Sequence, residues 1–580
     1  MQFCYFGVAG RTAHGEHHFV QAPFRGGRRR QSGRSPAGSV RSTGEHPVSH
    51  DSTDRLETPS LWRPLRIPTF RRLLVADIVS DIGTFMQSVG SAWLMVSLGV
   101  GPLYVALTQT ASSAPFFLFA LPAGSIGDIV DRRRLILWTE AWMVGVAALL
   151  AIMTLSGTIT PWLLLALTFA LSAGDAIETP TWRAVLPELV PKQDLPAASA
   201  LNGIEFNLAR ATGPALAGAL IAVAGVGAAF LVNVFSFIGV ILVVASWKRA
   251  VKVRTAPIET LEGATVAALR YVRNAPVTRA VIFRTGVVMF CASAPLALLP
   301  TVAHAISRNA IAYGVLLGAF GAGAIAGAVV MQRARSRWSS ETVVSFAIAL
   351  LGVMTAAMPR FRTLAGLALV MFVSGGAWLT FISLANAFVQ TVAPDWVRAR
   401  VLAIFMLITQ GGLAAGSVVW GIIGSRESVD AALVWAGLAT VAATSLGFVA
   451  RLPDRVVDLS PWNHWRMPAI LESAAPGLED GPVLVTLEYD VDPSQVNAFL
   501  KEMQRYGRVR RRSGASRWGI FRDVERPHVY LESFVVTSWA EHLRQHERVT
   551  KADTALEQEI RRRARGEPIV RHLIYAQPKE

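Results

Sequence analysis

Between about residue 73 and residue 450, long apolar stretches follow one another and short charged connections separate them. Each stretch has roughly 20 residues, the length that a helix needs to cross the hydrocarbon core of a bilayer. Backbone polar groups in a bilayer must be hydrogen-bonded within the protein, which favours helices for such runs. We predict twelve membrane-spanning helices, near residues 73–98, 103–124, 135–156, 161–181, 200–222, 226–247, 280–303, 312–332, 341–358, 363–386, 401–424 and 430–450.

The composition agrees with a polytopic membrane protein. The sequence is 52% hydrophobic and only 17% charged, whereas soluble domains average about 25% charged residues. The net charge of +16 does not indicate nucleic acid, because the basic residues lie in connections between apolar stretches. Cys4 and Cys291 are the only cysteines, so neither a disulfide framework nor a cysteine metal site is indicated.

The distribution of Lys and Arg predicts the topology. They concentrate in every second connection and in the flanking segments, and cytoplasmic loops are enriched in these residues. The opposite connections contain only Arg308, Arg360, Arg362 and Arg426. We therefore expect a multi-pass protein of the plasma (inner) membrane with both termini in the cytoplasm. The polar, Arg-rich segment 1–58 is expected to be a disordered cytoplasmic tail.

An internal repeat divides the apolar region into two halves. Gly124, Arg132, Arg134, Pro191 and Gly213 recur at a constant interval as Gly327, Arg335, Arg337, Pro394 and Gly416. Two six-helix bundles in the same orientation, 59–247 and 280–450, follow from this repeat, with 248–279 as a central cytoplasmic loop. Parallel repeats of this kind are found in facilitator transporters.

A soluble module follows the last apolar stretch. Residues 451–480 are predicted to be a linker, and residues 481–580 to form a small α+β domain. Alternating residues predict strands at 483–490, 517–521, 529–536 and 569–575, and helices are expected at 493–506 and 538–563. The order β-α-β-β-α-β is the ferredoxin-like arrangement. A second copy of the chain, bound through this sheet, is one partner that we consider.

The connection between the second and third apolar stretches is densely charged. It reads Gly124-Ser-Ile-Gly-Asp128-Ile-Val-Asp131-Arg132-Arg133-Arg134. This spacing resembles the signature loop between helices 2 and 3 of the major facilitator superfamily of transporters. The usual glycine between the acid and the basic pair is absent, and Asp131 lies near its place.

Several further blocks are similar to the enterobactin-exporter-like branch of that superfamily, including a C-terminal extension found on some members. They are 61–65, 80–84, 187–191, 200–203, 209–218 and 546–553. The resemblance spans about residue 60 to the end of the chain. It implies a major facilitator fold and proton-driven export of a siderophore, drug or related amphiphile by alternating access.

The resemblance also suggests an inner gate. In the family, the acid and arginines of the loop tie helices together in the outward-facing state. Asp175 and Glu178 lie three residues apart on one face of the fourth helix. We expect them to close the gate through ion pairs with the arginines. The predicted gate set is Gly124, Asp128, Arg132, Arg133, Arg134, Asp175 and Glu178.

Other ionisable residues fall inside the predicted membrane helices, where charge is costly and often functional. Asp77 and Asp81 share one face of the first helix and are either a proton or cation site or carboxylates satisfied by polar neighbours. Arg210 and Arg284 either bind an anionic substrate or balance a buried carboxylate. The proton or substrate candidates are Asp77, Asp81, Glu140, Glu205, Arg210 and Arg284.

The chain lacks a Gly-x-x-x-x-Gly-Lys-Ser/Thr loop, which argues against an ATP-driven pump. His542 and His546 lie four apart on a predicted helix, and His572 lies in the last strand. With no third ligand evident, we interpret the two helical histidines as solvated surface. We expect no metal, cofactor, nucleic acid or enzymatic activity. The alternative is a membrane-anchored enzyme or sensor whose activity resides in residues 481–580.

Overall fold

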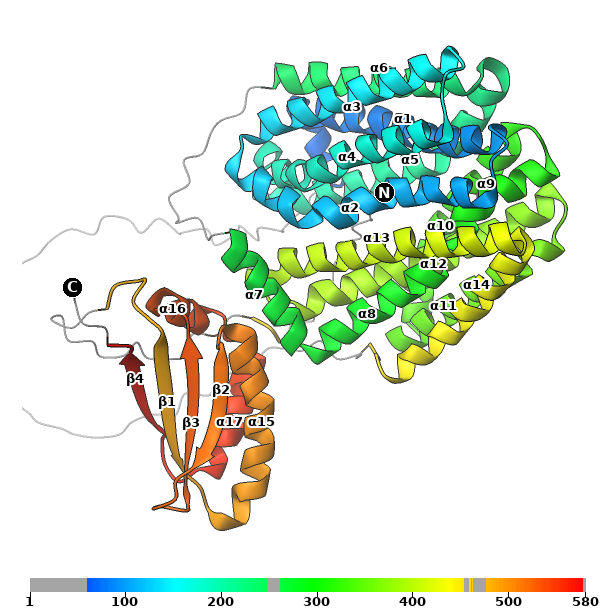
Figure 1. Ribbon diagram of the computed structural model, residues 1–580. Helices are drawn as coiled ribbons and strands as arrows, with labels where there is room; N and C mark the ends of the chain where they lie inside the picture. Colours follow the sequence, from blue (N-terminus) through cyan, green and yellow to red (C-terminus); the bar gives the residue numbers. More distant parts are fainter. Residues whose placement is uncertain (1–59, 248–260, 453–457, 461, 463–475, 577–580) are drawn as a thin grey trace, which may run out of the picture.

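The computed structural model describes residues 60–247, 261–452, 458–460, 462 and 476–576. Within these ranges it describes only the backbone at 120–121, 123–129 and 261–264. The predicted tail 1–58 and most of the predicted linker 451–480 lie outside the described residues. The described chain forms a large helical bundle and a small α/β domain at one end of it (Figure 1).

Among the described residues, the helices between 68 and 246 form the first half of the bundle (Figure 1). Proline occupies the first turn of α1, α4 and α5, where its missing N–H is not needed. Gly225, with a φ of 80°, is the single residue between α5 and α6, and this left-handed conformation favours glycine. The helices are α1 Pro68–Ser97, α2 Pro102–Ile129, α3 Arg132–Leu155, α4 Pro161–Leu189, α5 Leu195–Ala224 and α6 Val226–Ser246.

The second half repeats the pattern with one interruption. The predicted segment 280–303 is broken at Ala292 and Ser293, because Pro295 in the first turn of α9 cannot continue the preceding helix. The helices are α8 Pro276–Cys291, α9 Ala294–Ile306, α10 Ala310–Arg335, α11 Ser340–Ala357, α12 Leu364–Val392, α13 Asp395–Arg426 and α14 Val429–Ala443.

The number of membrane spans agrees with the repeat. Eleven helical segments of the described residues are long and apolar enough to cross a membrane. α2, with 28 residues, occupies the place of the remaining predicted segment. Large apolar side chains are exposed on the outside of the bundle, among them Phe235 at 68% and Leu242 at 66%. Such a surface suits contact with lipid, so the chain is a multi-pass membrane protein.

The two halves meet at two places, where α5 packs against α10 and where α2 packs against α13. A Cβ atom on Gly314 would lie 2.6 Å from the carbonyl oxygen of Pro214 and 3.0 Å from Cα of Gly218. The glycines therefore let two backbones touch, as small residues commonly do between membrane helices.

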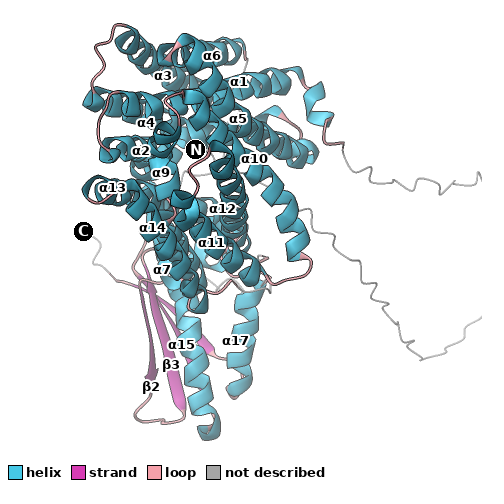
Figure 2. Ribbon diagram, turned by 90° about the vertical axis from the view of Figure 1, so that its right-hand side faces the viewer, coloured by secondary structure: helices cyan, strands magenta, loops and turns pink. Residues whose placement is uncertain are grey.

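The C-terminal domain has the predicted ferredoxin-like topology. Its antiparallel sheet has the order β2-β3-β1-β4, and α15 and α17 lie side by side on one face (Figure 2). The predicted helix 538–563 is two helices, because Thr550 and Asp553 form a capping box that starts α17. The elements are β1 Val483–Asp490, α15 Val496–Ser513, β2 Arg517–Arg522, β3 Val529–Val536, α16 Trp539–Glu547, α17 Lys551–Arg563 and β4 Ile569–Ile574.

The predicted central loop contains a further helix, α7 Leu261–Asn274, which lies between the bundle and the C-terminal domain (Figure 1). The hydroxyl of Tyr271 donates to the carbonyl oxygen of Val392 at the end of α12 (2.8 Å). On the other side, Nη1 of Arg270 donates to the carbonyl oxygen of Gly514 (2.9 Å). The guanidinium of Arg548 lies 4.5 Å from the ring centre of Trp396 on α13. The domain is thus docked on the bundle.

Candidate functional site

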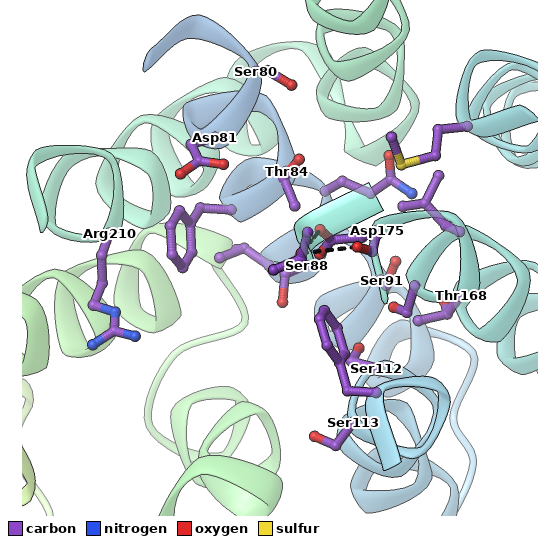
Figure 3. A pocket seen from close by; sticks show the side chains of 18 of the residues that line it. Ser80, Asp81, Thr84, Ser88, Ser91, Ser112, Ser113, Thr168, Asp175 and Arg210 are labelled. Carbon is purple, nitrogen blue, oxygen red and sulfur yellow. Dashed lines mark hydrogen bonds between the residues drawn. The ribbon is translucent and has the colours of Figure 1, made fainter. Parts of the chain in front are cut away.

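A cavity of about 180 Å³ lies inside the first half of the bundle and reaches the second half. Helices α1 to α6 supply most of its lining, and Leu296 of α9 with Tyr313 and Leu317 of α10 complete it. Polar side chains from several of these helices surround one open space (Figure 3). Because it touches both halves, movement of one half against the other would change its shape.

One face of α1 supplies a polar stripe. Asp77, Asp81, Thr84, Ser88 and Ser91 follow one another at intervals of three or four residues, which is the helical period, and all line the cavity. Ser112 and Ser113 of α2 face the same space (Figure 3). Of these residues, only the two aspartates were predicted from the sequence. The period of Ser and Thr at membrane depth is the signal that would have revealed the others.

Five of the predicted carboxylates line this cavity: Asp77, Asp81, Glu140, Asp175 and Glu178. Several are held by neutral donors. The indole nitrogen of Trp182 donates to Oδ2 of Asp77 (3.0 Å), and the hydroxyl of Thr139 donates to Oε2 of Glu178 (2.6 Å). The hydroxyl of Thr179 donates to Oδ1 of Asp175 (3.1 Å). Hydrogen bonds of this kind offset part of the cost of burying polar groups.

Arg210 contributes a cation to the acidic cavity. It lines the space from α5, is 8% exposed, and its guanidinium lies 4.9 Å from the ring centre of Phe206. Figure 3 places Arg210 and Thr168 on opposite sides of the opening. Glu205 is buried on α5 and interacts with Asp81 without lining the cavity.

Arg284 does not belong to the cavity lining. It is 1% exposed on α8, and its Nη1 donates to both carboxylate oxygens of Glu341 on α11, each at 2.9 Å. The hydroxyl of Ser345 donates to the same carboxylate (2.7 Å). Of the two roles that the sequence left open for Arg284, this geometry fits the balancing of a buried carboxylate.

Among the side chains that the structure describes, Arg132 contacts groups other than Asp175 and Glu178. Nη1 of Arg132 donates to the carbonyl oxygen of Ala184 (2.8 Å) and pairs with Glu188 (2.7 Å) near the end of α4. Glu178 lies six residues before Ala184, about 9 Å along the helix, and Asp175 lies deeper still. Both acids face the cavity instead. Arg132 thus pairs with Glu188 in place of the expected Asp175 and Glu178.

The rest of the charged hairpin caps helices. Nε of Arg133 donates to the carbonyl oxygen of Val244 (3.1 Å) at the end of α6, where a cation is favourable. Asp131 caps α3 by accepting a hydrogen bond from the backbone N–H of Arg134 (3.0 Å). Gly124 and Asp128 lie in the last turns of α2, and their side-chain surroundings are outside the described part of the chain.

The C-terminal histidines are not solvated surface. His542 is 0% exposed and His546 is 8% exposed, and their Nε2 atoms lie 3.1 Å apart. His572 of β4 joins them, and one ring nitrogen from each of the three lies within 4.8 Å of the others. Burial lowers the pKa of His542 to about 3, with help from His546 and His572. Burial also lowers the pKa of His572. The sequence did not show that α16 packs against β4.

A two-half bundle of membrane-spanning helices around a polar cavity defines a membrane transporter of the major facilitator type. The chain belongs to the family of transmembrane secretion effectors. The sequence pattern of this family matches the chain over residues 59–579. This match covers the bundle and the C-terminal domain together, so the domain is part of what the family shares.

A curated relative is known. The staphyloferrin A transporter of Staphylococcus aureus (strain NCTC 8325 / PS 47) is 29% identical over 164 residues. The aligned region covers 28% of this chain and 41% of the relative. The chain therefore matches less than half of the relative's length.

Solved transporters share the fold. A bacterial homologue of the human lysosomal transporter Spinster covers 67% of this chain and 96% of its own, with a TM-score of 0.52 and 12% identity. A mutant of the nucleoside transporter NupG covers 66% of this chain and 100% of its own, with a TM-score of 0.54 and 14% identity. A bacterial homologue of the iron transporter ferroportin covers 66% of this chain and 98% of its own, with a TM-score of 0.52 and 15% identity. At these identities the likeness concerns the fold alone.

Proposed function

We propose that this transporter is a secondary active exporter that moves a small siderophore-like molecule out of the cell in exchange for protons. The named function of the S. aureus relative supports the siderophore class. The cavity supports a polar, anion-bearing substrate, because Arg210 is its only lining Lys or Arg among the described residues. A buried guanidinium in a polar cavity is well suited to bind a carboxylate or similar group.

The observation that carries the proposal is the clustering of five carboxylates in one cavity with a single arginine. Like charges repel strongly where water is scarce, so such a cluster can take up and release protons as the cavity opens to either side. In the proposed cycle, protons occupy the carboxylates after substrate has left toward the outside. When the cavity opens to the inside, the carboxylates release these protons and become negatively charged again. A new substrate molecule then binds to Arg210.

The proposed export also needs an orientation of the chain in the membrane. We propose that the charged α2–α3 hairpin and the C-terminal domain face the cytoplasm of the plasma membrane, with both termini on that side. The excess of Lys and Arg in these connections supports this orientation. Arg132 and Arg133, which bind the ends of α4 and α6, would then stabilise the closed arrangement of the inner end.

The test is uptake into inside-out vesicles prepared from cells that express the chain. Staphyloferrin A and unrelated drugs are supplied outside, and the vesicle interior is acidified. We expect accumulation of the siderophore that collapses when a protonophore removes the pH gradient. Accumulation that persists unchanged with the protonophore would contradict proton exchange. Accumulation of drugs without the siderophore would contradict the proposed substrate class.

A further inference from the structure

Three imidazole rings converge between α16 and the edge strand β4. His542 and His546 lie one helical turn apart on α16, so their side chains share one face. His572 reaches them from β4, with its ring centre 4.9 Å from that of His542. The ring centres of His542 and His546 are 4.6 Å apart. Segments separated in the sequence thus bring three nitrogen ligands to one place.

The spacing of the nitrogens is close to what a metal ion requires. Tetrahedral Zn²⁺ binds imidazole at about 2.0–2.1 Å, which places two ligand nitrogens about 3.3 Å apart. The Nε2 atoms of His542 and His546 are 3.1 Å apart. The full set spans 4.8 Å, so His572 has to move inward by a small rotation of its side chain. His572 is half-buried on the edge strand β4.

The surroundings leave one further ring nitrogen available. Nε2 of His572 is buried and forms no hydrogen bond with any described residue. A buried polar atom left in this state costs about 1–3 kcal/mol, and coordination would remove that cost. Trp539 packs beside two of the rings, with its centre 5.2 Å from His542 and 6.2 Å from His572, and shields them from solvent.

The cation that acts on His542 is already paired. Arg510 acts electrostatically on His542, but its Nε is paired with Glu532 at 3.1 Å, and that carboxylate is fully buried. On α16, Glu541 is shared by Arg548 at 2.7 Å and Arg544 at 2.9 Å. A metal ion between the three rings therefore meets a paired Arg510, while the remaining arginines of α16 gather around Glu541.

We propose that His542, His546 and His572 form a binding site for a late first-row divalent cation such as Zn²⁺. Neutral imidazoles favour ions of this class, and three of them leave at least one coordination position for water or another ligand. The site ties α16 to β4. It also lies beside Glu541, whose Oε1 is 3.7 Å from Nη1 of Arg270 on α7, so the ion sits next to the contact between the domain and the bundle.

The test uses the full chain, purified in detergent through an affinity tag without histidine and stripped with a chelator. The protein is equilibrated with Zn²⁺ alone, and bound metal is counted per chain. Co²⁺ is then used as a visible-absorption probe of the coordination geometry. The variants are His546→Gln and His572→Gln. The matched control is His528→Gln, an exposed histidine of the same domain just before β3. Circular dichroism and thermal unfolding check that each variant is folded.

The unmodified chain also has histidines outside the described residues, namely His14, His17, His18, His46, His50 and His464. These are present in every protein compared, so differences between variants report on the proposed site. We expect His546→Gln and His572→Gln each to lose one bound ion and the tetrahedral Co²⁺ absorption. We expect His528→Gln to keep the bound ion and the absorption. Equal metal content in all proteins, or no binding by the unmodified chain, would overturn the proposal and leave a hydrogen-bonded histidine pair.

Discussion

The indole nitrogen of Trp182 on α4 donates a hydrogen bond to Oδ2 of Asp77 on α1, at 3.0 Å. It joins the first cavity-lining residue of α1 to the last one of α4 and so links the two helices at one end of the acidic cavity. A carboxylate buried beside other acids depends on such a donor, because water is scarce around it. Asp77 and Trp182 should therefore act together in holding this end of the cavity.

We predict that Trp182→Phe weakens the folded bundle by about 1–3 kcal/mol, because it keeps the ring but leaves a buried acceptor without its donor. Thermal unfolding in detergent measures the change, and vesicle uptake measures the loss of transport. The control is Trp138→Phe on α3, where the side chain is 75% exposed. Equal effects of the two substitutions would show that the hydrogen bond to Asp77 is unimportant.

Asp81→Asn should uncouple substrate transport from the proton gradient. Asparagine has a similar shape but cannot carry a proton, so substrate should still exchange across the membrane without being concentrated. We expect exchange of labelled substrate to persist while accumulation driven by a pH gradient falls by at least about tenfold. Asp430→Asn, at an exposed ion pair with Arg362 on another part of the bundle, serves as control. Uphill transport by the Asp81 variant would rule out Asp81 as the sole coupling group.

Arg284 and Arg210 should behave differently when they are replaced. Removing one partner of a buried ion pair leaves an uncompensated charge, so Arg284→Met should cost about 3–5 kcal/mol of stability. Arg284→Met combined with Glu341→Leu should recover much of this loss, since both charges are then absent. Arg210→Met should mainly weaken substrate binding. Thermal unfolding and the concentration dependence of uptake distinguish the two. A stable Arg284→Met variant that binds substrate poorly would assign Arg284 to the substrate site.

The glycine contact between the two halves should be intolerant of any side chain. In Gly314→Ala, the new Cβ would lie 2.6 Å from the carbonyl oxygen of Pro214, so α5 and α10 would have to separate. We expect a lower unfolding temperature and strongly reduced transport. Gly145→Ala on α3 is the matched control, because its Cβ would meet no described atom within 4 Å. Normal transport by Gly314→Ala would mean that the halves do not need this close approach.

Sequence periodicity predicted most of the fold because apolar runs and alternating strands are local signals. β1 and β3 begin and end at the predicted residues. The break at Ala292 was missed, although Pro295 is visible in the sequence, because the apolar run continues through it. α7 was missed because it lies in a charged stretch that is amphipathic and not apolar throughout.

The candidate site was predictable only in part. Asp81 and Arg210 stand out as charges in apolar helices, and both line the cavity. Partners could not be predicted, since they depend on how helices pack. Arg132 meets Glu188 instead of the deeper acids, and Arg284 meets Glu341 in the first turn of α11. His572 joins α16 through the order of the sheet, which residue spacing does not contain.

The cation–π contact between Arg548 and Trp396 has a consequence for control of the transporter. An isolated contact of this kind contributes only about 0.5–2 kcal/mol. The two residues belong to one chain, however, so their encounter is intramolecular and corresponds to a local concentration of about millimolar order. The domain can therefore stay bound to the bundle through a few weak contacts. A molecule that binds either surface with moderate affinity can still release it. Docking of this strength is reversible without unfolding of either part.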